Sequence, residues 1–302
     1  AQVNQAKTAE LRPVLGDPAF QPMETVWRSL DMLVRGIETD DTLEVGLLDA
    51  GRDELTADAG FLAENPARSG LHRLLVEAAE RPGAKPWSVI VLGFRMGGSP
   101  EDLTLLAAMA ALGSRLGAPV LAGVSPTVVG AHSWKDLAEP TRWEDPADAQ
   151  AWNAFRATPP AGWVAAFLPR LLLRLPYGAT TDALEVFPFE ECPTPGDADA
   201  LLLGSAAFGA AKLLAQSFRA RGWDMEPGDI RDLDDIPAYV YERDGERRLM
   251  PAAGISLSER AADALLQRGI CPLMSAADRS LARVVRFQSA ASPPAALPGR
   301  WK

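Results

Sequence analysis

Cysteine and histidine are scarce in this chain, with two of each among 302 residues. Cys192 and Cys271 lack the spacing of zinc ligands, so the sequence predicts a cytoplasmic protein without disulfides or structural zinc. Neither His72 nor His132 has a cysteine or acidic partner at ligand spacing, which disfavours a metal site and a hydrolase triad. No Gly-x-Ser-x-Gly motif occurs either. We therefore predict no enzyme activity and no catalytic, cofactor-binding or metal-binding residues.

Long apolar runs and excess positive charge are also lacking. The apolar run from Trp163 is interrupted by Arg170, and the run after Asp199 is interrupted by Lys212, so no membrane insertion is predicted. Thirty basic residues against forty acidic residues give a net charge of −10. This balance disfavours nucleic acid as a partner.

Length and element order predict an α/β fold. A chain of 302 residues exceeds the usual single-domain size. Because a Pro-, Asp- and Trp-rich stretch at 140–160 looks like a connection, we predict two α/β domains with mixed sheets flanked by helices, at 1–150 and 151–290. Residues 291–302 are predicted to be a disordered tail.

The first half alternates helical and strand patterns. A helix over 20–34 would place Trp27 on its apolar face as the anchor against a sheet. The segment 99–102 carries a serine cap, a proline at the first helical position and acidic residues, and the helix it opens would join two parallel strands. The elements expected in this half are helices at 20–34, 71–79 and 100–116, and strands at 43–48, 87–93 and 120–124.

In the second half, the Asp244-Gly245 pair between two strand-like runs predicts a hairpin. A long buried helix is expected at 198–221, a final helix from Ser258 to about Arg268, and a final strand at 281–287.

The segment 168–178 combines leucines at helical spacing with Arg170 and Arg174, and Pro176 ends the pattern. It is predicted to be a helix with one apolar face. Glu190 or Glu191 is expected to pair with one of these arginines, and the sequence does not fix which. The candidate structural or interface residues are Arg170, Arg174, Tyr177, Phe189, Glu190, Glu191 and Trp27.

The glycine-containing turn at 93–98 follows an expected strand and precedes a helix, a place where anions bind. Its spacing matches neither the dinucleotide-binding nor the P-loop pattern. The turn's position still allows an alternative function, that of a small-ligand-binding protein or enzyme that uses this turn.

Several landmarks resemble the large sheath subunit of the type VI secretion system, the TssC or VipB family. They keep the family's order from near residue 10 to about Ser289. The landmarks are Asp17-Pro18-Ala19-Phe20, Trp27-Arg28-Ser29-Leu30, Ser99-Pro100-Glu101-Asp102, Ala118-Pro119 with Ser125-Pro126, the segment 168–178, Phe187-x-Phe189-Glu190-Glu191, Gly222-Trp223 and Gly269-Ile270-Cys271-Pro272-Leu273.

This resemblance implies a structural subunit of a contractile sheath. Such a subunit assembles with a TssB- or VipA-like small subunit and with copies of itself in a helical sheath, which contracts to propel an Hcp-type tube. Family members carry further segments at both ends, so contacts with the tube and a ClpV-type ATPase are expected only if such segments exist. Within the family, the alternative is a shortened accessory protein that binds the baseplate or caps a sheath end.

Overall fold

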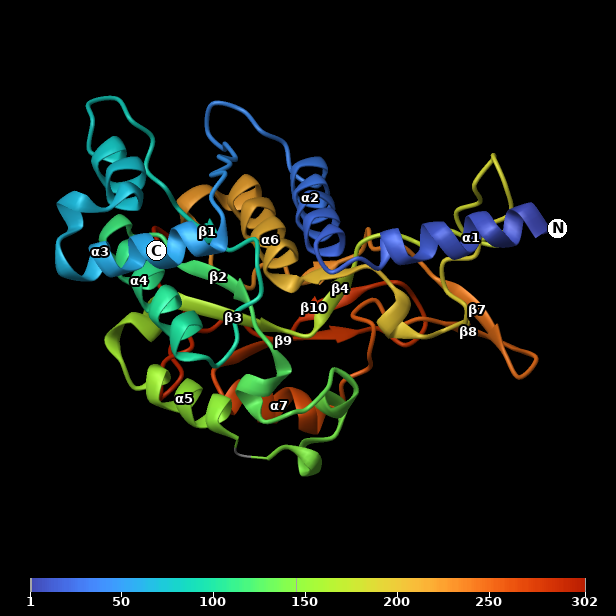
Figure 1. Cartoon of the computed structure of the whole chain (residues 1–302). Coiled ribbons are helices and arrows are strands. Elements are labelled where there is room, and N and C mark those ends of the chain that lie inside the picture. The colour runs from blue at the N-terminus through green and yellow to red at the C-terminus, as the bar shows by residue number, and fades with distance from the viewer. Residues whose placement is uncertain (1, 145, 302) are drawn as a thin grey trace.

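The computed structural model describes residues 2–144 and 146–301, which fold around a six-stranded mixed sheet (Figure 1). The α-helices are α1 (Gln2–Leu15), α2 (Phe20–Arg35), α3 (Arg52–Glu64), α4 (Pro100–Leu116), α5 (Ala147–Arg156), α6 (Ala206–Arg221) and α7 (Glu259–Gln267). The strands are β1 (Ile90–Val91), β2 (Val120–Gly123), β3 (Val164–Leu168), β4 (Arg170–Leu172), β5 (Leu203–Ser205), β6 (Asp232–Leu233), β7 (Val240–Arg243), β8 (Glu246–Leu249), β9 (Ile270–Ser275) and β10 (Ala282–Val284). A π-helical turn, His72–Glu77, lies inside the helix expected at 71–79.

The main sheet has the strand order β1-β2-β3-β9-β10-β6. Strands β1, β2, β3 and β9 are parallel, whereas β10 pairs antiparallel with β9 and β6. Helix α4 joins the parallel strands β1 and β2, which confirms the predicted crossover. Two further strand pairs, β4-β5 and β7-β8, are antiparallel. The predicted α/β class with a mixed sheet and flanking helices is confirmed.

Strand β3 shows how the sheet separates two apolar layers. Val164, Ala166 and Leu168 pack in the same cluster as residues of α4, α5 and α7, while Ala165 and Phe167 pack in the cluster formed with α6. All five residues are fully buried. A strand covered by helices on both faces is apolar at every position instead of alternating.

Local signals at element ends are confirmed. Ser99 Oγ accepts a hydrogen bond from the Asp102 amide at 3.1 Å, and α4 ends at Gly117 with φ of 67°. The hairpin β7-β8 turns at Asp244 and Gly245, which have φ of 56° and 78°. Both residues adopt the left-handed conformation that such two-residue turns require.

Strands from both sides of residue 150 share the main sheet, because β2 pairs with β3 along four residues. Near the C-terminal end, Leu297 is buried and Arg300 Nη2 donates to the Leu116 carbonyl at 2.7 Å. The division at residue 150 and the disorder of 291–302 stay predictions.

The helix predicted at 168–178 is wrong. Residues 164–168 form β3, and residues 170–172 form β4, which pairs with β5. Proline at 169 has no amide hydrogen for a helix interior. Leu168, Leu171 and Leu172 are buried on the two strands, so their burial does not follow from a helical period. The predicted helix at 198–221 likewise begins only at Ala206, because 203–205 form β5.

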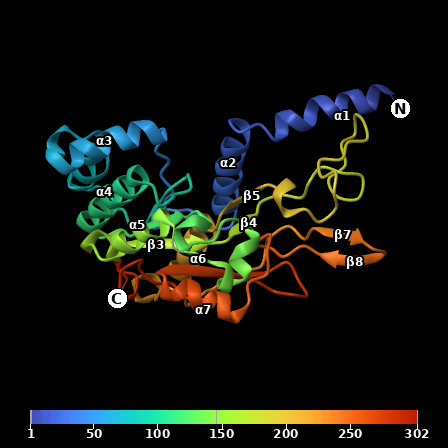
Figure 2. The same ribbon diagram turned by 60° about the horizontal axis from the view of Figure 1, so that its bottom comes forward.

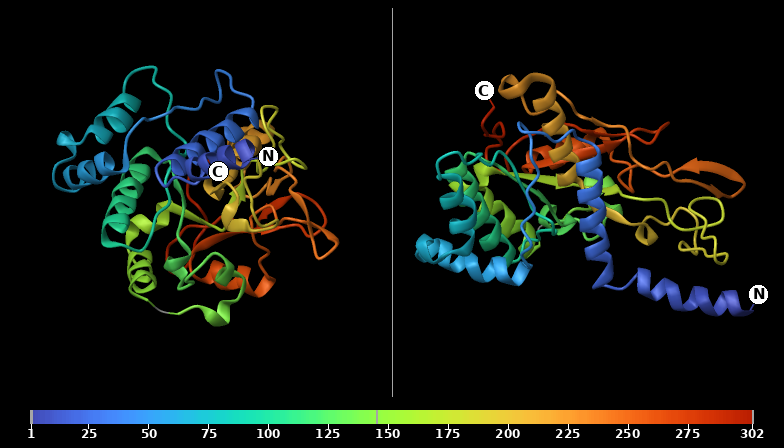
Figure 3. Two further views of the ribbon diagram at one scale, coloured as in Figure 1. Left: turned by 45° about the vertical axis from the view of Figure 1, so that its right-hand side comes forward. Right: turned by 90° about the horizontal axis from the view of Figure 1, so that it is seen from above.

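The strand predicted at 43–48 is also wrong. Its described backbone has no strand, and the Leu47 side chain is 63% exposed. Helix α1, the irregular segment 176–197 and the hairpin β7-β8 all extend from the same side of the molecule, away from α3 (Figures 2 and 3). On this side, helix α1 contacts the segment 176–197 through the Arg12 side chain.

Candidate functional site

Arg174 lies at the centre of a cluster that joins α2 to the segment 176–197. Its Nε donates to Glu24 Oε1 at 2.8 Å, and Nη2 reaches Glu24 Oε2 at 3.3 Å. Two further bonds to Glu191 measure 2.6 and 2.8 Å, and the Leu175 carbonyl accepts the last at 3.1 Å. The five N–H groups of a guanidinium are thus all used within the chain.

The cluster is largely withdrawn from water. The side chains of Arg174, Glu191 and Glu24 are only 7%, 10% and 11% exposed. Burial works against the charged guanidinium, but the hydrogen bonds from Glu191 and Glu24 outweigh it and raise the pKa of Arg174. Burial also opposes the charge of Glu24, yet its bonds to Arg174 and Arg28 lower the pKa of that carboxyl group. Arg174 and Glu24 therefore stay ionised at neutral pH.

Tyr177 and Glu191 close the segment 176–197 on itself. The Tyr177 amide donates to Glu191 Oε2 at 2.8 Å, and the Glu191 amide donates to the Tyr177 carbonyl at 2.8 Å. The Arg174 guanidinium lies over the Tyr177 ring, 4.6 Å from its centroid, in a cation–π contact. Phe189 is buried and packs edge-on against Phe187 at 6.0 Å between centroids.

Glu190 and Glu191 diverge. Glu190 Oε1 accepts from the Ala179 amide at 2.9 Å, and its carbonyl accepts from Arg12 Nη2 of α1 at 2.6 Å. Glu191 therefore pairs with Arg174, while Glu190 holds the chain turn and α1. The role of Glu24 had no signal in the local sequence, since Glu24 lies 150 residues from Arg174.

Arg170 lies apart from this cluster. Its guanidinium is 4.2 Å from the centroid of the Trp134 ring, and Nη2 is 3.7 Å from Asp199 Oδ1. Burial lowers the pKa of Arg170 to about 10; the charge of Asp199 opposes this shift and that of Arg95 adds to it. Its Nε is buried without a hydrogen-bond partner.

Trp27 is on the outer side of α2, so its predicted role as an anchor in the core is wrong. Helix α2 packs against α6 and β5 through the opposite side, which carries the buried Ser29 and Leu33. A Cβ on Gly204 of β5 would lie 2.7 Å from Ser29 Oγ. The helix approaches β5 this closely because both residues are small. The apolar face that carries Trp27 is exposed to solvent.

The turn at 93–98 binds a carboxylate of its own chain. The Gly97 amide donates to Asp102 Oδ2 at 2.7 Å, and Arg52 pairs with the same carboxylate. A Cβ on Gly98 would lie 2.5 Å from the Asp148 carbonyl oxygen. The glycines therefore allow close packing, and an internal acid already takes the place of an anion.

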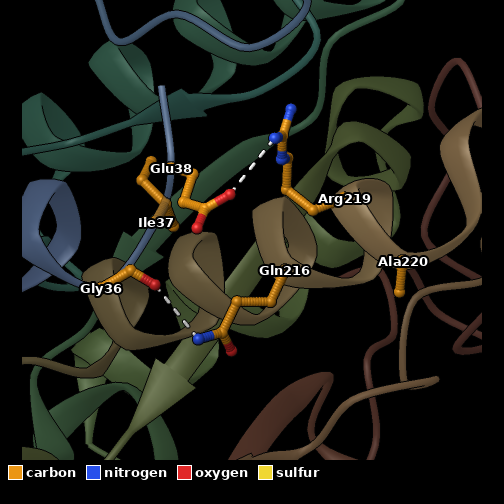
Figure 4. Close-up of a pocket in the computed structure, with 6 residues that line it drawn as sticks. All are labelled: Gly36, Ile37, Glu38, Gln216, Arg219 and Ala220. Carbon is orange, nitrogen blue, oxygen red and sulfur yellow. Dashed lines mark hydrogen bonds and ion pairs between the residues drawn. The ribbon is translucent and has the colours of Figure 1, made fainter. Parts of the chain in front are cut away.

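A shallow hollow lies where the turn after α2 meets α6 (Figure 4). Gln216 Nε2 donates to the Gly36 carbonyl at 3.1 Å, and Arg219 pairs with Glu38 at 3.4 Å. These polar groups bond to each other across the hollow. Among residues 2–144 and 146–301, no group of three or more His, Cys, Asp or Glu side chains is placed to hold a metal ion, and no helix is long and apolar enough to span a membrane.

The family model described as "EvpB/VC_A0108, tail sheath N-terminal domain" (VipB) matches residues 1–292 of the chain. The chain belongs to this VipB family. It is also 28% identical over 304 residues to the type VI secretion system sheath protein TssC1 of Pseudomonas aeruginosa. That match covers 97% of the chain and 61% of TssC1, so the chain spans less than two thirds of the length of TssC1. The membership predicted from the ordered landmarks is confirmed.

Proposed function

We propose that this chain is the large-subunit part of a type VI contractile sheath in the cytoplasm, where it assembles with a TssB-like small subunit and with copies of itself. Membership of the tail sheath family supports this, as does the sheath function named for TssC1. A sheath works through its interfaces, and it needs no catalytic residues. The proposed role is therefore structural and not enzymatic.

The observation that carries the proposal is the outer face of α2. Met23, Trp27 and Val34 follow helical spacing on this face and are 53%, 59% and 43% exposed. Aligned apolar side chains, with a tryptophan among them, are typical of protein interfaces, where a buried tryptophan often dominates the binding energy. We assign this face to the small sheath subunit.

The Arg174 cluster gives α2 a fixed position on the body of the molecule. Glu24 lies on α2 between Met23 and the exposed Trp27, and its carboxylate is held by Arg174 just beyond β4. A helix fixed in this way presents its outer face without having to order first, which lowers the entropic cost of binding. Arg174 thus acts within the subunit, and Trp27 acts between subunits.

Contraction in this proposal is a switch between two packings of the same subunits. Interfaces with complementary patches have discrete alternative arrangements, and the fall in free energy between them does the work of moving an Hcp-type tube. Because α2 is tied to β4 and to the segment 176–197, we expect it to move together with the subunit body.

The test uses the whole gene product that contains this chain, co-expressed with the small sheath subunit. Trp27→Gln is expected to abolish co-purification of the two proteins while its free energy of unfolding stays within about 0.5 kcal/mol of the wild type. Leu47→Gln is the matched control, because Leu47 is as exposed but lies in an irregular segment. Normal assembly of Trp27→Gln would rule out this face as the contact. Failure of the unaltered protein to bind any small sheath subunit would overturn the sheath function itself.

A further inference from the structure

Two arginines share one tryptophan ring on the side of the molecule formed by the turn after β1 and the start of β4. The guanidinium carbons of Arg95 and Arg170 lie 5.3 and 4.2 Å from the centroid of the Trp134 ring. Stacking on an aromatic ring holds a guanidinium in place but leaves its N–H groups, which lie in its plane, free to donate. The contact with the ring therefore orients the N–H donors of the two arginines without forming hydrogen bonds to them.

Neither guanidinium has a hydrogen-bond acceptor among the described residues. Arg170 is 17% exposed, its Nε is buried and unpartnered, and its contact with Asp199 at 3.7 Å is too long for a hydrogen bond. Asp199 is shared with Lys135, whose Nζ is 3.1 Å from the other carboxylate oxygen. Arg174, four residues along the chain, has all its N–H groups bonded. Arg170, by contrast, has a long ion pair with Asp199 and a contact with the Trp134 ring, but no hydrogen bond.

Such an arrangement costs stability in the free chain. A buried donor without an acceptor loses its hydration and gains nothing in exchange. The charges of Arg95 and Arg170 also repel each other, which contributes to the lowered pKa of Arg170. An anion bound by both groups would offset their mutual repulsion.

We propose that Arg95 and Arg170, oriented by Trp134, form a binding site for a carboxylate group. Arginine forks match the two oxygens of a carboxylate, and the forty acidic residues of the chain make carboxylates abundant on any second copy. The carboxylate comes either from an acidic side chain of another copy or from a small carboxylate anion in solution. The site does not rest on the proposed sheath function, because the isolated chain would bind the anion by itself.

The first experiment titrates the isolated chain with malonate at constant ionic strength, with chloride as the reference salt, and follows Trp134 and the other tryptophans by fluorescence together with the melting temperature. Malonate is expected to give a saturable rise in melting temperature. Arg95→Gln is expected to weaken malonate binding by about tenfold or more, the loss typical of a charged hydrogen bond. The control is Arg247→Gln, on the exposed hairpin strand β8, which should bind like the wild type. Binding that is absent, or equal in all three proteins, would overturn the site.

A second variant separates binding from a structural role of Arg170. Arg170→Met keeps an unbranched apolar stem and removes the charge, so it is expected to abolish malonate binding without lowering the melting temperature. A large fall in melting temperature would show that the guanidinium holds the fold, and it would overturn the proposal.

Sedimentation of the assembled gene product then identifies the source of the carboxylate. If Arg95→Gln binds malonate weakly and also assembles less with its own copies, the carboxylate comes from a neighbouring subunit. If malonate binding is lost and assembly is unchanged, the natural ligand is a small carboxylate anion. Both outcomes support the site, and both differ from a failure to bind the small sheath subunit.

Discussion

Glu24 and Arg174 are 150 residues apart in the sequence, yet their side chains are joined by bonds of 2.8 and 3.3 Å. Glu24 Oε1 also accepts from Arg28 Nε, one turn further along α2, at 2.7 Å. Because Glu191 binds the other edge of the same guanidinium, one arginine joins a helix near the N-terminus to a segment in the second half of the chain. Arg174 is therefore expected to contribute strongly to the stability of the fold.

Arg174→Ala is expected to lower the free energy of unfolding by about 3–5 kcal/mol, because it removes the shared guanidinium from two largely buried carboxylates. Urea unfolding of the isolated chain measures the loss. Arg35→Ala is the matched control: it breaks the ion pair with Asp31 on the same helix, where Arg35 is 80% exposed, and should cost less than about 1 kcal/mol. Equal losses in the two variants would mean that the buried cluster adds nothing to stability.

The contribution of Glu24 is expected to depend on pH. The pKa of Glu24 is lower in the folded chain than the ordinary value of 4.5, so the unfolded chain binds the proton more readily. The stability that comes from its charge is therefore present above about pH 4.5 and is lost as the pH falls through the lower, folded pKa. The destabilisation caused by Glu24→Gln, about 1.5–3 kcal/mol at pH 7, should shrink between pH 5 and pH 3.5 in urea unfolding curves. A difference that stays constant over this range would contradict the prediction.

Features determined within a few residues could be predicted from the sequence. The Ser99 cap, the end of the helix expected at 100–116 and the Asp244-Gly245 turn depend on local backbone geometry, and all three are confirmed. The order of the family landmarks was likewise readable, and it led to the correct family.

Features that depend on distant parts of the chain could not be predicted. The side of α2 that faces inward is decided by the small residues Ser29 and Gly204, and hydrophobicity alone favoured the side with Trp27. Leu168, Leu171 and Leu172 lie on strands that other elements bury, so their helical spacing carried no information about a helix. Trp134, which lies beneath Arg170, gave no signal at all because stacking leaves no pattern along the sequence.

Both thiols are expected to react slowly in the folded chain. Burial raises the pKa of Cys271 to about 12, and burial together with the charge of Glu191 raises that of Cys192 to about 11. At pH 8 the thiolate fraction is then more than about 100-fold below that of a free cysteine. Labelling with a chromogenic disulfide should be slow in buffer, with Cys192 reacting before the fully buried Cys271, and fast for both in urea. A wild-type chain that labels in buffer as fast as a small thiol would contradict this, and Cys192→Ser would show which thiol is responsible.

Gly130 is expected to tolerate no side chain. Its φ is 85°, and an added Cβ would fall on the carbonyl oxygen of Glu144, whose amide donates to the Gly130 carbonyl at 2.9 Å. A left-handed conformation costs a residue with a Cβ about 1–2 kcal/mol by itself, and the backbone clash adds to it, so Gly130→Ala should destabilise the chain by more than about 2 kcal/mol. Gly162→Ala is the control, since a Cβ there meets nothing within 4 Å and the expected change is within about 0.5 kcal/mol. Urea unfolding of both variants measures the difference, and a Gly130→Ala chain as stable as Gly162→Ala would show that the contact with Glu144 yields without cost.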